Sequence, residues 1–236
     1  WDRALFLNLT FWNSEQGAEV LCEGSQAADA VAHAAWHHLA GAALAQAAGP
    51  GRQSAAAFFC GESIASSFDL YLVGRLLDNA PDSDFIVTQV PILHEVANEA
   101  GGSDAAFAAM LAEIVRDPER AFEDLRTLLF EISMALFACE DVCAAEATLQ
   151  RFTGRRFEPL LHHYQLSNWI LHARAYATPS PPHDAAVAAL HAALRAAPLD
   201  QGARAVIRGN PYEVREVPVD DPGVRADVDT PADYQA

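Results

Sequence analysis

Two histidines lie four residues apart, and a glutamate follows them in the next predicted helix. His33 and His37 fall in an Ala-rich segment of helical composition, and Glu62 lies 25 positions beyond His37. At 3.6 residues per turn, both imidazoles face the same side of a helix. Two histidines from one helix and a glutamate from the next, with a fourth position for water, form the ligand set of a catalytic zinc site. The pattern therefore predicts a zinc or iron site at these three residues.

A purely structural role explains the same residues. Histidines on Ala-rich helices often pack with one ring nitrogen satisfied, and Glu62 would serve equally as a cap or an ion-pair partner. Nine histidines in 236 residues also make a chance pair at this spacing common. His94-Glu95 and His162-His163 are further candidates, for which the structural role is favoured. Both interpretations of the first helix stay open at this point.

The two helices carry a motif resemblance. Residues 33–40 resemble the H-E-x-x-H helix of gluzincin peptidases, and residues 62–69 are similar to the aminopeptidase pattern N-E-G-F-A-x-x-x-E. Glu62, Ala65 and Asp69 match the Glu, Ala and final acidic positions of that pattern. The resemblance implies a metalloenzyme acting on a small molecule or a peptide.

The sequence departs from the family pattern at positions that matter for catalysis. Ala34 occupies the position of the catalytic Glu, which would take the proton from a metal-bound water. Gly61 stands where the aminopeptidase pattern has Asn. The resemblance thus implies a metal site without the usual base, and His38, Glu23 and Glu95 are the candidates to replace that base.

The C-terminal part contains four segments in a fixed order: LDQGARAVIR (199–208), VREVPV (214–219), DPGV (221–224) and DVDTPADY (227–234). With them, residues 187–236 resemble the C-terminal end of molybdenum-cofactor cytidylyl- and guanylyltransferases. The resemblance implies that Asp227 and Asp229 lie near the nucleotide's metal, and paired carboxylates suit Mg²⁺.

The nucleotide-binding part of that family is not found. The family opens with a strand and a glycine-rich loop that hold the triphosphate, whereas Gly49-Pro50-Gly51-Arg52 follows a predicted helix. We therefore expect no complete nucleotidyltransferase. The segment is either a remnant of gene fusion or completes a sheet with a protein partner or a second copy of the chain.

Charge and cysteine content exclude several classes of protein. With 32 acidic and 15 basic residues, the net charge of −17 opposes contact with nucleic-acid phosphates and with anionic membranes. No apolar run approaches the roughly 20 residues that span a bilayer. Four cysteines are too few for a disulfide scaffold, and we expect them to be reduced and buried; Cys139 and Cys143 would share a helical face. The first residues resemble no secretory signal, so a soluble, cytoplasmic protein is expected.

Hydrophobic periodicity predicts a mainly α fold, a helical bundle with a small α+β C-terminal appendage. Residues 1–177 form the helical domain, 178–184 a Pro-rich linker and 185–236 the nucleotidyltransferase-like segment. One strand is expected at 5–11, and an extended segment at 85–90 ahead of Pro91. The predicted helices cover residues 26–48, 54–77, 92–100, 103–115, 118–150 and 157–177.

Two functions remain open. The first is a metal-binding helical protein that uses His33, His37 and Glu62. The second is a non-catalytic helical module associated with molybdenum-cofactor nucleotidyltransferase function through its C-terminal segment.

Overall fold

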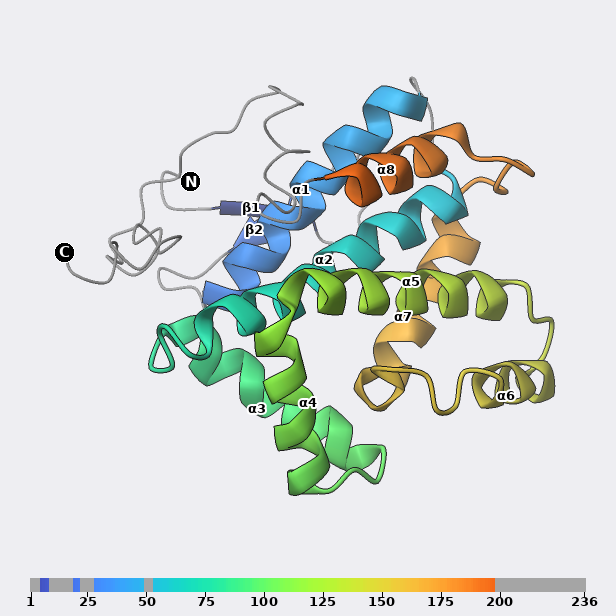
Figure 1. Ribbon diagram of the computed structural model, residues 1–236. Coiled ribbons are helices and arrows are strands. Elements are labelled where there is room, and N and C mark those ends of the chain that lie inside the picture. The colour runs from blue at the N-terminus through green and yellow to red at the C-terminus, as the bar shows by residue number, and fades with distance from the viewer. Residues whose placement is uncertain (1–4, 9–18, 22–27, 49–52, 198–236) are drawn as a thin grey trace.

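The computed structural model describes residues 5–8, 19–21, 28–48 and 53–197 (Figure 1). The described part is mainly α-helical, which confirms the predicted class. Its helices are α1 (Ala28–Ala48), α2 (Ala55–Leu76), α3 (Asp84–Glu99), α4 (Asp104–Arg116), α5 (Pro118–Phe137), α6 (Val142–Gln150), the 3-10 helix η1 (Glu158–Leu160), α7 (His163–Tyr176) and α8 (Ala185–Ala196). Two short strands, β1 (Leu5–Asn8) and β2 (Glu19–Leu21), pair antiparallel.

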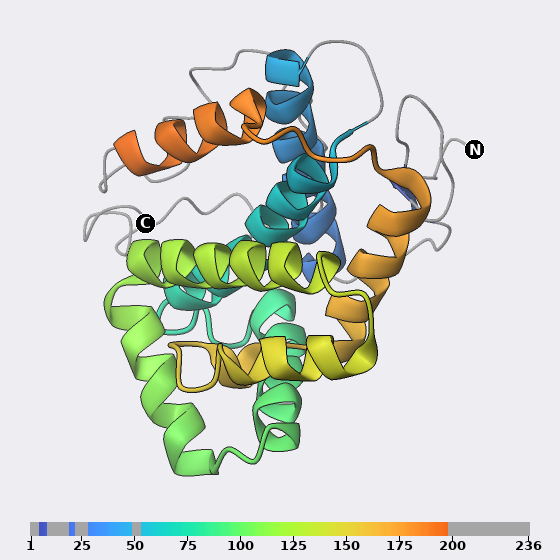
Figure 2. The ribbon, with the colours of Figure 1, turned by 90° about the vertical axis from the view of Figure 1, so that its right-hand side faces the viewer.

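Helix α2 is the central element of the fold. It runs between α1 and α5, while α3 and α4 form a pair that extends away from the other helices (Figures 1 and 2). Fifteen of its 22 residues are buried. Its apolar and small residues therefore surround the whole helix rather than form one stripe, which is typical of a core helix. A polar residue on α2, such as Glu62, is consequently buried together with the helix.

The hydrophobic core has two main clusters on opposite sides of α2. The larger one joins α2 to α5 and α7 and includes Phe59, Ile132 and Trp169. The second joins α2 to α1 and α8 and includes Trp36 and Leu190. The helix that carries His33 and His37 is therefore fixed by apolar packing on both α2 and α8.

Side-chain caps define where most helices begin. A Ser or Asp side-chain oxygen accepts a hydrogen bond from a backbone N–H of the first turn at Ser54, Ser83, Ser103, Asp117, Asp141 and Asp184. These oxygens satisfy N–H groups that have no partner within the helix. Pro118 occupies the first position of α5, as the sequence predicts, because no backbone donor is needed there.

Two predicted elements are wrong, and the helix expected over 157–177 is divided into η1 and α7 by the extended backbone of Leu161 and His162. The single helix expected over 118–150 is broken, since α5 ends at Phe137 and Asp141 caps the new helix α6. The extended segment expected at 85–90 is helical, because α3 runs without interruption through Pro91. The preference against helix before proline is small, and Ser83 capping together with burial of Phe85 and Ile86 outweighs it.

The break after α5 also changes the environment of the cysteines. Cys139 lies in the connection after α5 and Cys143 on α6, so the predicted common helical face does not exist. Cys60 is buried as expected, whereas Cys143 is exposed. Cys139 lies 3.3 Å from the hydroxyl of Thr148 and donates a hydrogen bond to the carbonyl of Ala135. Cys22 lies outside the described residues.

The Pro-rich segment before α8 lies across the start of α2. Ser54 and Thr178 form an isolated parallel bridge, the backbone N–H of Ala56 donates to Ser180 Oγ at 2.8 Å, and the Ser54 hydroxyl donates to Asp184. Helix α8 then packs beside α1. Residues 185–196 are thus part of the helical body in the described structure, while the predicted segments 199–208 and 214–234 lie outside it.

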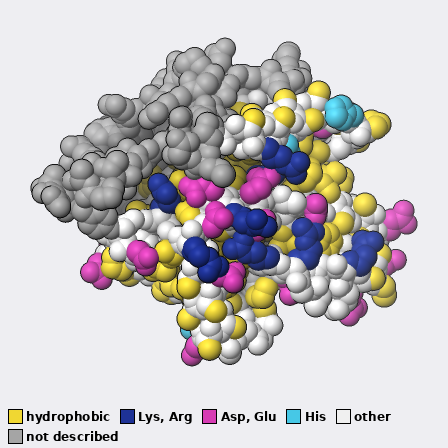
Figure 3. All heavy atoms as spheres, in the orientation of Figure 1, with side chains coloured by type: hydrophobic (Ala, Val, Ile, Leu, Met, Phe, Trp, Pro, Cys, Tyr) yellow, Lys and Arg dark blue, Asp and Glu magenta, His cyan; other side chains and the backbone are white. Residues whose placement is uncertain are grey.

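Arginine supplies every basic side chain, since the sequence has no lysine. On the face shown in Figure 3, arginines alternate with carboxylates. Several arginines form ion pairs on or near α5, for example Arg75 with Glu119 and Arg156 with Asp124. Within the described helices, none combines the length and apolarity that crossing a membrane requires.

Candidate metal centre

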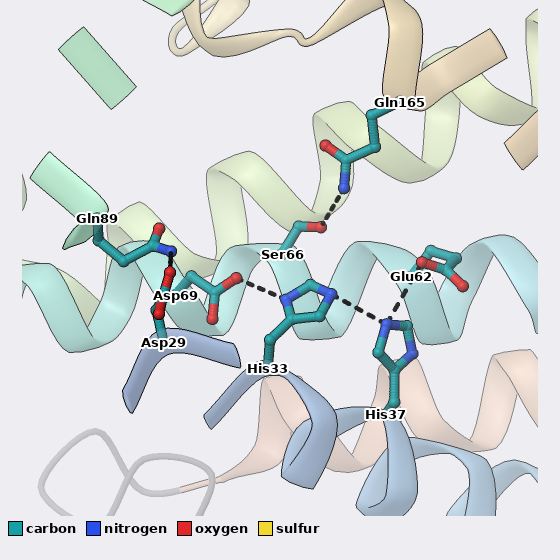
Figure 4. A network of polar contacts seen from close by, with 8 residues as sticks. All are labelled: Asp29, His33, His37, Glu62, Ser66, Asp69, Gln89 and Gln165. Carbon is teal, nitrogen blue, oxygen red and sulfur yellow. Dashed lines mark hydrogen bonds and ion pairs between the residues drawn. The ribbon is translucent and has the colours of Figure 1, made fainter. Parts of the chain in front are cut away.

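Helices α1 and α2 place their polar residues opposite each other in antiparallel order. His37 of α1 faces Glu62 of α2, and one turn earlier on α1 His33 faces Asp69 (Figure 4). Each pair follows from helical periodicity, since residues four apart on α1 and seven apart on α2 lie on one face. The four side chains form a continuous polar cluster between two otherwise apolar helix faces.

The distances within this cluster are short. Nε2 of His33 and Nε2 of His37 lie 3.0 Å apart, and their rings are inclined by 74°. Nε2 of His37 lies 3.5 Å from Oε2 of Glu62. On the other side of the His33 ring, Nδ1 donates to Oδ2 of Asp69 at 2.6 Å. Three potential ligand atoms therefore lie side by side, and a carboxylate orients one of the rings.

The hydrogen bond from His33 to Asp69 fixes the role of each ring nitrogen. A carboxylate that accepts from Nδ1 selects the tautomer in which Nε2 carries a lone pair. The pKa of the Asp69 carboxyl is raised because burial disfavours its charge, and the hydrogen bond from His33 acts in the opposite direction. His33 is thus held with Nε2 directed at His37.

His37 is held in its neutral form. Burial, and then the nearby His33, lower the pKa of His37 to about 3. A neutral imidazole offers a lone pair, which is the form in which histidine binds metals. The side chain of His37 is 19% exposed and that of Glu62 only 7%, so Glu62 is the deepest member of the cluster. His33 is 30% exposed and marks the side open to solvent.

The cluster continues along both helices (Figure 4). Asp29, one turn before His33, accepts a hydrogen bond from Gln89 of α3 at 3.0 Å. Ser66, between Glu62 and Asp69, lies 3.5 Å from the side-chain nitrogen of Gln165 of α7. Within the described residues, Oδ1 of Asp29 and Oδ1 of Asp69 are buried without a hydrogen-bond partner.

The ligand spacing is close to that of a tetrahedral metal site. Bonds of about 2.0–2.1 Å put neighbouring ligand atoms roughly 3.3 Å apart. The distances from His37 Nε2 to His33 Nε2 and to Glu62 Oε2, 3.0 and 3.5 Å, lie on either side of this value. Nevertheless, no three His, Cys, Asp or Glu side chains in the described ranges already form a group that could hold a metal ion. Binding would require a rearrangement of these side chains.

The structure brings together the three predicted ligands, His33, His37 and Glu62. Asp69 joins them; the sequence marks it as the final acidic position of the aminopeptidase-like pattern. Sequence reasoning missed Asp29 and Gln89. The spacing of four between Asp29 and His33 is a signal that could have revealed Asp29, whereas Gln89 comes from α3 and has none.

The other predicted site residues lie elsewhere. Glu95 is exposed on α3 and is not one of the eight residues of the network in Figure 4. Neither the side chain of His38 nor Glu23 is among the described parts, and the same holds for Asp227 and Asp229. Of the other histidine candidates, His94 contacts Asp104 at 2.9 Å, and His162 accepts from the backbone N–H of Gln165 as the cap of α7.

Comparison of this chain with family models, with curated proteins and with solved structures gives no match.

Proposed function

We propose that the protein binds one divalent transition-metal ion, zinc or iron, between α1 and α2 through His33, His37 and Glu62. The observation that supports this most is the contact between the two Nε2 atoms at 3.0 Å. Between two uncharged imidazoles one nitrogen donates to the other, whereas a metal ion would accept a lone pair from each Nε2 once both are unprotonated. Imidazole nitrogen and carboxylate oxygen are ligands common to zinc and non-haem iron.

The hydrogen bond between His33 and Asp69 also supports the proposal. Metal-binding histidines usually donate their second ring N–H to a carboxylate or carbonyl, which orients the ring and raises its basicity. Nδ1 of His33 makes this contact with Asp69 at 2.6 Å. The Nε2 atom of His33 is thereby left with the lone pair that a metal ion requires.

The burial of Glu62 is the second argument. An isolated buried carboxylate costs several kcal/mol unless it is paired. The side chain of Glu62 is 7% exposed, and its distance to His37 Nε2 is 3.5 Å, longer than a good hydrogen bond. A cation shared by Glu62 and the two histidines would place a full positive charge beside this buried carboxylate.

The proposed function is metal binding. Its more specific form is that the protein is a metal-dependent hydrolase. A bound zinc ion lowers the pKa of a bound water and so supplies a nucleophile. Ala34, at the position of the gluzincin base, is buried and carries no proton acceptor. The usual general-base step is therefore not part of the proposal, and the substrate class stays a small molecule or a peptide.

Elemental analysis of the protein, purified without a metal-binding tag, tests the proposal. We expect about one zinc or iron ion per chain, retained after dialysis, and its loss in His33→Ala and in Glu62→Gln. His183→Ala is the matched control, because His183 is exposed just before α8 and should leave the metal content unchanged. Circular dichroism shows whether the variants remain folded. A chain without metal after incubation with zinc and with ferrous iron would overturn the proposal.

The C-terminal α+β appendage and its relation to molybdenum-cofactor nucleotidyltransferases stay proposals that rest on the sequence pattern of residues 187–236. The same applies to Mg²⁺ at Asp227 and Asp229.

A further inference from the structure

Helix α8 is held to α5 by a buried arginine outside the metal centre. Arg126 of α5 is fully buried. Its Nε and Nη2 atoms donate to the two carboxylate oxygens of Glu123, the first at 2.9 Å. The remaining terminal nitrogen, Nη1, lies 3.0 Å from Nε2 of His191 on α8. The buried guanidinium of Arg126 is therefore shared between a carboxylate of α5 and an imidazole of α8.

This geometry requires His191 to be neutral. A guanidinium group has only donors, so Nε2 of His191 must be the acceptor and its proton must reside on Nδ1. A protonated His191 would direct an N–H at a buried cation. The contact would change from a hydrogen bond to a repulsion between like charges in a site of low polarity.

The groups around His191 offer little compensation for a second positive charge. From α5 they are Arg126, Glu123 and the ring of Phe130, which meets the imidazole edge to face. From α8 itself Arg195 lies 3.5 Å from Glu123. Glu123 thus already serves two arginines.

The elements on the other side of α8 are mainly apolar. Helix α1 contributes Trp36, Ala40 and Leu44 to the cluster that packs against α8, and α2 contributes small and apolar residues together with Cys60. The thiol of Cys60 is uncharged at neutral pH, because burial raises its pKa to about 12. Asp184, at the start of α8, accepts a hydrogen bond from the Ser54 hydroxyl.

The apolar attachment of α8 is small. Three of its residues, Ala186, Val187 and Leu190, are buried against α1 and α2. Two of these are short side chains, so the area that α8 buries is modest compared with α2 or α5. The polar contact at Arg126 therefore matters for whether α8 stays docked.

We propose that α8 is a pH-sensitive latch, docked on α1 and α5 while His191 is neutral and released when His191 becomes protonated. Release would uncover part of the apolar cluster in which α1 and α8 now pack together. The latch uses none of the proposed metal ligands, so the test of the latch is independent of the test of metal binding.

The direction of the pH effect follows from the two states of His191. In the docked state, burial and then the charge of Arg126 lower the pKa of His191 to about 4, against the ordinary 6.5. The released state therefore binds more protons between these values, and docking weakens as the pH falls through this range. Because a single proton is bound, the docking equilibrium shifts by at most about tenfold per pH unit.

Hydrogen–deuterium exchange of the full chain tests the latch. Exchange is measured at about pH 7, 6 and 5, with labelling times scaled to the intrinsic rate. We expect the peptide covering 185–196 to lose protection by up to about tenfold per pH unit. The peptide covering α5 should stay protected over the same range.

Two variants distinguish the release of α8 from a general loss of structure at low pH. In His191→Gln the side-chain carbonyl can accept from Arg126 but cannot be protonated in this range, so protection of α8 should be independent of pH. His183→Gln, an exposed histidine beside α8, should behave like the original protein. Equal pH dependence in His191→Gln and in the original protein would overturn the proposal.

A direct titration keeps the test decisive if a variant folds poorly. The ring resonances of His191 in the unaltered protein, followed by NMR, should titrate well below the ordinary value for histidine. A titration of His191 near the ordinary value for histidine would also overturn the proposal.

Discussion

Asp69 of α2 accepts a hydrogen bond from Nδ1 of His33 of α1 at 2.6 Å, and this contact leaves Nε2 of His33 directed at His37. The orientation of the candidate metal centre thus depends on a residue that is not itself one of the proposed ligands.

Replacing Asp69 by Asn should weaken metal binding without abolishing it. The amide accepts more weakly than a carboxylate and no longer fixes the tautomer, so we expect affinity to fall about 10- to 100-fold. Competition with a chromophoric chelator measures this. Asp82→Asn, an exposed position in the connection before α3, is the matched control. Unchanged affinity in Asp69→Asn would mean that Asp69 does not orient a ligand.

At Gly74, helix α2 closely approaches the junction of α4 and α5. A Cβ atom there would lie 2.7 Å from Cβ of Pro118 and 2.8 Å from the carbonyl oxygen of Ile114. We expect Gly74→Ala to reduce the free energy of unfolding by about 1–3 kcal/mol through overpacking. Urea unfolding of the metal-free protein provides the measurement.

The same substitution at Gly41 should have the opposite sign. A Cβ atom at Gly41, within α1, meets nothing within 4 Å among the described atoms. Alanine is the better helix former there, so we expect a gain of about 0.5–1 kcal/mol. Equal effects at Gly41 and Gly74 would show that the close approach at Gly74 is not a constraint.

Ser54 has two roles, because it caps α2 and also contacts Asp184 before α8. Ser54→Ala removes both contacts, and we expect a loss of about 1–2 kcal/mol in the free energy of unfolding. Ser103→Ala removes a cap alone, at the more exposed start of α4, and should cost about 0.5–1 kcal/mol. Thermal or urea unfolding compares the two, and a larger loss at Ser103 would contradict the double role.

Glu123 should contribute to stability in a pH-dependent way. Burial acts to raise the pKa of Glu123, but the hydrogen bond and charge of Arg126, with Arg195, outweigh it and lower the pKa below the ordinary 4.5. Its stabilisation is therefore complete above the ordinary value and is lost as the pH falls through the lowered pKa. We expect Glu123→Gln to be less stable at neutral pH and to lose less stability on acidification.

Urea unfolding at about pH 7 and pH 3.5 tests this difference. Glu131→Gln is the control on the same helix, because its pair with Arg155 is exposed, and the change should stay within about 0.5 kcal/mol at neutral pH. Parallel loss of stability in the original protein and Glu123→Gln would exclude the assigned role of Glu123.

Local sequence patterns predict the helical elements well where capping residues are present. Ser54, Ser103 and Asp117 each precede a helix that begins where expected. The predictions that were wrong lie where the local sequence patterns are weaker. Nothing in 118–150 shows which polar residue ends the helix, and the proline rule at Pro91 gives only a preference that tertiary packing overrides.

The sequence by itself determined the mainly helical class and the shared face of His33 and His37, because helical periodicity is a local property. It also indicated Glu62 as a partner through motif spacing. Only the tertiary structure decided that α1 and α2 run antiparallel in contact, so that Asp69 reaches His33 and Glu62 reaches His37. It likewise decided that α8 covers Arg126, since residues 65 positions apart meet only through packing of whole helices.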